Sequence, residues 1–134
     1  MIPLIPLLVA GPFARLPAGA VASALASGLR AGGWPEVDVC ELEDALAEPD
    51  FGARMRRARA VVIAQRRLTE AALRGSAAFE IATRARQAGV PCFAVTARNG
   101  LSAFDARILD LQLVLQAADA AALRSAGHML ARHL

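Results

Sequence analysis

Four arginines lie in segments that follow predicted strands, and their side chains are the ones in this sequence best suited to bind a ligand. Arg15 follows the first apolar run, Arg66 and Arg67 follow another, and Arg98 follows a third. Guanidinium groups are planar, permanently charged donors that match the oxygens of phosphates and carboxylates. These positions predict an anionic ligand, and the alternative is an arginine-rich, solvated rim that binds nothing.

Two further segments extend the candidate site. Gln65 precedes the arginine pair, while Gly75 and Ser76 precede an apolar helical stripe, where backbone N–H groups at residues 75–77 are expected to be free for an anion. The predicted ligand-binding residues are Arg15, Gln65, Arg66, Arg67, Gly75, Ser76 and Arg98.

Residue types that carry catalysis are scarce near these segments, where Glu70 is the one acid. No glycine-rich nucleotide motif and no serine nucleophile elbow occurs. His128 and His133 fall in the last predicted helix without zinc-ligand spacing, and Cys40 and Cys92 end apolar runs, as buried structural cysteines do. We therefore predict no catalytic residue, no metal and no disulfide.

Charge is distributed unevenly along the 134 residues. All 15 basic residues are arginines; residues 1–50 carry two arginines and seven acids, whereas residues 51–134 carry thirteen and five, which together give the net charge of +3. The cluster at residues 54–59 has no interleaved Tyr or Trp, so we expect a solvated face, or pairing with the acidic segment 41–50, instead of nucleic-acid binding.

The hydrophobic pattern predicts strands alternating with helices. Continuous apolar runs at 5–10, 60–64 and 90–96 are typical of strands buried on both faces, residues 37–42 alternate as an edge strand does, and 111–115 is a fifth strand. Helical stripes are expected at 17–30, at 50–57 with Asp50 as its cap, at 78–85 in a helix that ends at Gly89, and at 119–133.

This alternation predicts one α/β domain over residues 1–134, with a three-layer, mostly parallel sheet in the flavodoxin-like order 2-1-3-4-5. In such a sheet, ligands bind beyond the carboxyl ends of the strands. The first ten residues lack a basic region and are too short to span a bilayer, and prolines interrupt them, so we expect a cytoplasmic protein without a membrane partner.

Two stretches resemble the ATP-dependent glycerate kinase family. Residues 67–76 (Arg-Leu-Thr-Glu-Ala-Ala-Leu-Arg-Gly-Ser) and 85–95, with Gly-Val-Pro before a strand, match the C-terminal part of that family in spacing. Residues 7–10, 16–18 and 26–30 resemble its first strand, turn and helix. The family's large middle region has no counterpart here.

Departures from the family pattern fall on its reactive residues. The first loop is shortened to residues 10–15 and lacks the family's Asp, Ser and Lys; Gln65 and Arg66 replace Gly-Glu-Gly, its Asp falls on Thr69, and its turn Lys on Ser76. Phosphoryl transfer needs carboxylates that hold Mg²⁺ and cations that neutralise charge. The resemblance therefore implies a degenerate kinase core that serves binding, assembly or regulation and uses no cofactor.

Two alternatives stay open: a protein that binds a small anion, and a minimal glycerate kinase that would need ATP and Mg²⁺. Loss of the family's middle region would expose apolar surface at Leu101, Phe104 and the loop around Phe13, so a homodimer or another protein partner is expected.

Overall fold

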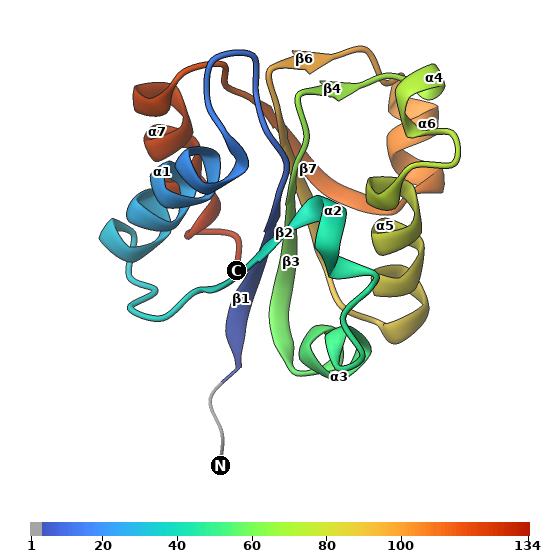
Figure 1. Cartoon of the computed structure of the whole chain (residues 1–134), viewed down its shortest axis with the longest axis horizontal. Helices are drawn as coiled ribbons and strands as arrows, with labels where there is room; N and C mark the ends of the chain where they lie inside the picture. The colour runs from blue at the N-terminus through green and yellow to red at the C-terminus, as the bar shows by residue number, and fades with distance from the viewer. Residues whose placement is uncertain (1–3) are drawn as a thin grey trace.

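The central element is a five-stranded parallel sheet with helices on both faces (Figure 1). The computed structural model describes residues 4–134. The interpretation of the first ten residues given above therefore lies outside the described part of the chain for residues 1–3. Hydrogen-bonded neighbours run in the order β2-β1-β3-β5-β7. The strands are β1 (Ile5–Ala10), β2 (Asp38–Glu41), β3 (Ala58–Ala64), β5 (Cys92–Thr96) and β7 (Leu111–Gln116).

The predicted α/β class with a three-layer arrangement is confirmed. The observed labels differ from the predicted order 2-1-3-4-5 because two short strands, β4 (Arg67–Leu68) and β6 (Arg98–Asn99), were not predicted and form a separate two-stranded ribbon. Counted within the main sheet alone, the strands are arranged second, first, third, fourth, fifth.

Two layers of helices cover the sheet. One face carries α1 (Ala18–Ala31) and α7 (Ala120–Leu130), and the other carries the shorter helices together with α5 (Figure 1). That second layer consists of α2 (Leu42–Ala45), α3 (Phe51–Arg56), α4 (Glu70–Leu73), α5 (Ala77–Ala88) and α6 (Ala103–Ile108).

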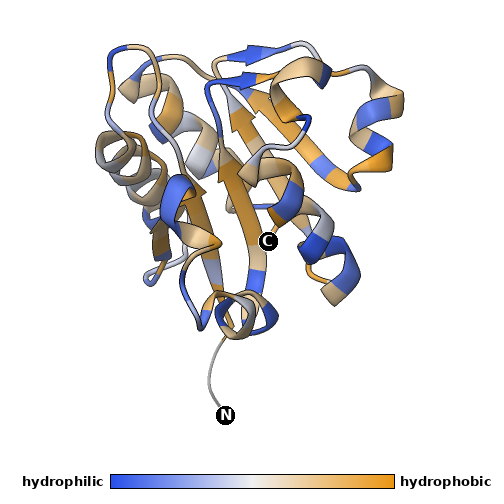
Figure 2. Cartoon of the chain, turned by 45° about the vertical axis from the view of Figure 1, so that its right-hand side comes forward, coloured by the Kyte–Doolittle hydropathy of each residue, from blue (hydrophilic) through white to orange (hydrophobic). Residues whose placement is uncertain are grey.

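The central strands divide the core into two halves. In β1, Leu7 and Val9 pack into the cluster under α5, whereas Leu8 and Ala10 pack under α1 and α7. Because successive side chains of a strand point to opposite faces, a strand covered on both sides must be apolar throughout. Figure 2 shows these strands as strongly hydrophobic, whereas much of the β4–β6 ribbon is hydrophilic.

Helices α1 and α7 cross at unusually close range. A Cβ atom added at Gly28 would lie 2.0 Å from the Arg124 carbonyl oxygen, and one at Gly127 would lie 2.3 Å from the Leu25 carbonyl oxygen. The backbones can approach so closely because both helices present glycine at the crossing. The predicted inward face of α7, which includes Leu123 and Gly127, is buried.

Helix ends follow the expected chemistry in one case and not in another. At α5, the Ser76 hydroxyl accepts a hydrogen bond from the Phe79 N–H, and Gly89 ends the helix in the left-handed conformation, with φ of 71°. The prediction that Asp50 caps α3 is wrong, because its carboxylate makes no capping bond; its φ and ψ of −97° and 6° are not the extended geometry of a helix cap.

Among residues 4–134, no helix combines the length and apolar content that a membrane crossing requires.

Candidate anion site at the carboxyl edge of the sheet

Backbone hydrogen bonds hold together the loops that leave the carboxyl ends of the central strands. The Gly11 N–H donates to the Ala64 carbonyl at 2.9 Å, and the Gln65 N–H donates to the Val95 carbonyl at 3.1 Å. These bonds continue the strand ladder past the end of β1 and β3. The loops after β1, β3 and β5 therefore form one continuous edge, where a doubly wound sheet binds its ligands.

The β4–β6 ribbon lies on this edge and is anchored by a buried hydroxyl. Thr96 is fully buried, and its hydroxyl lies 3.0 Å from the Arg66 carbonyl and 3.1 Å from the Arg98 carbonyl. The Ala97 and Arg98 N–H groups also donate to the Arg66 carbonyl. Thr96 thus fixes the two backbone segments that carry the arginines.

Register within the ribbon places two arginines side by side. Arg67 pairs with Arg98 across the parallel strands, so both side chains leave the same face of the ribbon. Both are exposed, and neither forms an ion pair with any of residues 4–134. Like charges directly opposite each other on a sheet repel, so an anion between these guanidinium groups would relieve that repulsion.

The remaining predicted residues are distributed differently. Gln65 donates through its side-chain amide to the Arg67 carbonyl at 2.9 Å, so it supports the ribbon. Arg66 is exposed at the end of β3. Arg15 is exposed in the loop after β1, which a bridge between Phe13 and Leu16 closes, and no hydrogen bond or ion pair among the described residues joins it to the ribbon.

Free donors were expected at the start of α5, and that prediction is wrong for Ser76. Its N–H donates to the Leu73 carbonyl at 2.9 Å, and its hydroxyl accepts from the Phe79 N–H. Gly75 adopts a left-handed φ of 70° in the tight connection between α4 and α5. The short helix α4, which was not predicted, consumes a donor that an anion would have needed.

Acidic residues line a different hollow on the same edge. Glu41 and Glu43 border a space of about 270 Å³ together with Gly11, Pro12 and the first turn of α1. Among residues 4–134, no group of three or more His, Cys, Asp or Glu side chains is arranged to hold a metal ion. The two carboxylates of this hollow come from β2 and α2 and not from the β4–β6 ribbon.

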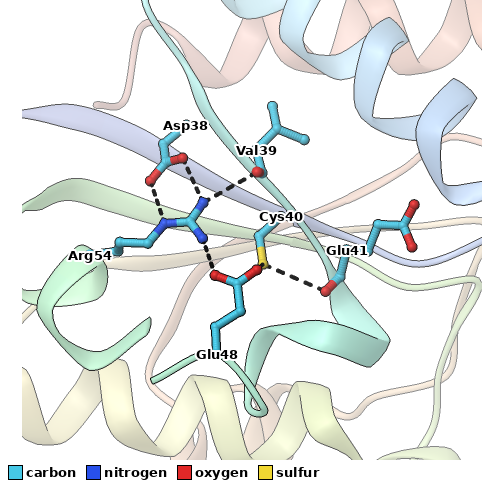
Figure 3. A network of polar contacts seen from close by, with 6 residues as sticks. All are labelled: Asp38, Val39, Cys40, Glu41, Glu48 and Arg54. Atoms are coloured by element: carbon cyan, nitrogen blue, oxygen red, sulfur yellow. Dashed lines mark hydrogen bonds and ion pairs between the residues drawn. The ribbon is translucent and has the colours of Figure 1, made fainter. Parts of the chain in front are cut away.

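Arg54 takes no part in this edge, because it is bound in a local network at β2 (Figure 3). Its guanidinium donates to Asp38 at 3.0 and 2.6 Å and forms an ion pair with Glu48. The hydrogen bond with Asp38 raises the pKa of Arg54 above its ordinary value. The expected pairing of this arginine cluster with the acidic segment is confirmed for Arg54.

Both cysteines are buried and free, as predicted. Burial raises the pKa of Cys40 to about 11, with a further contribution from the neighbouring Glu48 carboxylate 3.5 Å from its sulfur. Burial likewise raises the pKa of Cys92 to about 12. Strands β1 and β3 separate the two cysteines in the sheet. Neither thiol is suited to nucleophilic chemistry at neutral pH.

Fold and site together define a doubly wound α/β domain with an arginine-bearing ribbon at the carboxyl edge of its sheet. No family model matches the chain, and no curated protein matches it. Among solved structures it is similar to a candidate pilus assembly-related protein from Burkholderia pseudomallei, with 22% sequence identity and a TM-score of 0.56 over 96% of this chain and 90% of that one. At this identity the likeness supports the fold.

Proposed function

We propose that this chain is a non-catalytic, cytoplasmic α/β domain that acts by binding, in the assembly or regulation of a larger protein complex. One observation carries the proposal: the ends of β1 and β3, where a doubly wound sheet places its reactive groups, present Gly11, Pro12, Gln65 and Arg66. None of these side chains can act as a general acid or a nucleophile, and none is a carboxylate, the group by which proteins usually hold Mg²⁺.

The structural neighbour supports an assembly role, since a protein related to pilus assembly shares this fold over nearly the whole chain. The resemblance to glycerate kinases is compatible with the same proposal if the kinase chemistry has been lost. Thr69, at the position of the family's Asp, accepts a hydrogen bond from the Ala72 N–H and caps α4, so its hydroxyl has a structural task.

An enzymatic assay directly tests the proposal that the chain has no catalytic activity. The purified chain is incubated with ATP, Mg²⁺ and glycerate, and ADP release is followed with a coupled assay beside a melting curve. We expect no turnover above the protein-free rate and no rise in melting temperature with ATP and Mg²⁺. Turnover that disappears in Arg66→Ala but persists in Arg132→Ala, an exposed arginine on the C-terminal segment, would overturn the proposal.

Binding of a small anion is a second candidate function, favoured by the register that places Arg67 beside Arg98. Inorganic phosphate is then expected to raise the melting temperature more than NaCl does, because phosphate binds the folded state. The two salts are compared at equal ionic strength, so that both screen the protein's charges to the same extent. The difference should vanish in Arg67→Ala and in Arg98→Ala and remain in Arg132→Ala. An equal response to both salts contradicts this candidate.

A further inference from the structure

An apolar cavity opens between α4, α5 and α6, on the helical layer beside the edge of the sheet. Its volume is about 310 Å³, and its walls are mainly apolar. A cavity of roughly 150 Å³ lined by Leu, Ile and Phe suffices to hold a benzene ring. The apolar lining residues are Leu73, Phe79, Leu101, Ile108 and Leu109.

Large apolar side chains of α5 and α6, the helices that border this cavity, remain open to solvent. Phe104 is 69% exposed, Ile108 is 50% exposed and Phe79 is 41% exposed. Phe104 precedes Ile108 by four residues and so shares its face of α6. Since a phenylalanine has about 150–250 Å² to bury, Phe104 alone leaves on the order of 100 Å² or more of apolar surface uncovered.

The mouth also carries charges of both signs. Asp105 lines the cavity and forms no ion pair with any of residues 4–134. Arg74, which lines the cavity from the end of α4, is paired with Glu70 one helical turn away, at 3.1 Å. Those two side chains are 72–79% exposed, so the ion pair contributes little stability. Arg74 can therefore leave Glu70 for another carboxylate at little cost in free energy.

We propose that a second copy of this chain binds here, forming a two-fold dimer in which Phe104 of each copy enters the cavity of the other. In the same arrangement, Asp105 of each copy faces Arg74 of its partner. The inference rests on the proposed assembly function and deepens it by naming the partner and the surface.

Self-complementarity is the reason for choosing a second copy over an unrelated partner. A two-fold interface uses one patch twice, so it requires a projecting group and its receptor on the same surface. Phe104 and the cavity meet that requirement for shape, while Asp105 and Arg74 meet it for charge. A strongly acidic or basic partner is a poorer match, because this surface carries charges of both signs.

Sedimentation velocity of the full chain, from low to high micromolar concentration, tests the inference. We expect a concentration-dependent dimer whose dissociation constant rises about 30-fold or more in Phe104→Asp, as removal of a central anchor does. Met129→Asp is the matched control, because Met129 is 49% exposed on α7 at the other face of the sheet and should leave the dimer intact. A monomer at every concentration overturns the dimer, as does a dimer that Phe104→Asp leaves unchanged.

Charge exchange provides an independent check. Asp105→Arg and Arg74→Asp should each weaken the dimer, and the double variant should restore it, whereas a merely structural role would leave the double variant no better than the singles. Thermal melting of each variant establishes that it folds. ADP release in the kinase assay would refute the non-catalytic function without affecting the dimer, while a monomeric, inactive protein would refute only the dimer.

Discussion

Replacing Gly28 by alanine should destabilise the protein through the crossing of α1 and α7. The new Cβ would lie 2.0 Å from the Arg124 carbonyl oxygen and 2.8 Å from the His128 nitrogen, both backbone atoms that cannot rotate away. Relief requires the two helices to separate by about 1 Å, and a gap of that size forfeits up to half of the dispersion energy at each contact.

The expected magnitude follows from two opposing effects. Overpacking of a well-packed core costs typically about 1–3 kcal/mol, and here the obstacle is rigid backbone. Alanine recovers up to about 1 kcal/mol through its higher helix propensity. We therefore expect the free energy of unfolding to fall by about 2 kcal/mol, which for a chain of this size lowers the melting temperature by roughly 6–10 °C.

Urea unfolding followed by circular dichroism measures this loss, and Gly19→Ala in the same helix is the matched control. Gly19 has open space around a built Cβ and no positive φ, so alanine there should be neutral or stabilising by up to about 1 kcal/mol. The double variant Gly28→Ala with Gly127→Ala should lose less than the sum of the singles, because one separation relieves both clashes. A Gly28→Ala protein as stable as Gly19→Ala would refute the reasoning.

Two more predictions concern the buried cysteines and the ion-pair network at β2. The folded-state pKa values of Cys40 and Cys92 are raised above the ordinary value. The contribution of the two thiols to stability is therefore complete below about pH 9 and is lost as the pH rises toward 11 to 12. Urea unfolding should show this decline in stability, and the decline should be smaller in Cys92→Ala. Arg54→Gln should lower the free energy of unfolding by about 1–3 kcal/mol, because it leaves the Asp38 and Glu48 carboxylates without their cation, although partial exposure lets water replace part of the loss. An Arg54→Gln protein with an unchanged urea midpoint would show that the network is dispensable.

The central strands were predictable because a strand buried on both faces has to be apolar at every position. The predicted run at residues 5–10 coincides with β1, and the run at 60–64 covers all but the first two residues of β3. Glycine was equally informative at the end of α5, where Gly89 adopts the left-handed conformation and ends the helix as expected. The α/β class therefore follows from local pattern alone.

Short elements escaped prediction because they depend on contacts with distant residues. The strands β4 and β6 have two residues each, too few for any period, and they pair only because Thr96 and the Arg66 carbonyl hold their backbones together. The arginines of the candidate site were identified from their types and their place after strands. Which of them stand side by side was decided by that ribbon.

The sequence by itself determined which residues could be buried and which could bind an anion, since side-chain chemistry and spacing are local properties. Only the tertiary structure decided that Arg67 is paired in register with Arg98 and that the Ser76 N–H already donates to the Leu73 carbonyl. It also decided that Ile108 lines an apolar cavity while Phe104, four residues earlier on α6, stays 69% exposed. Such facts depend on register and helix packing, which join residues that the chain keeps apart.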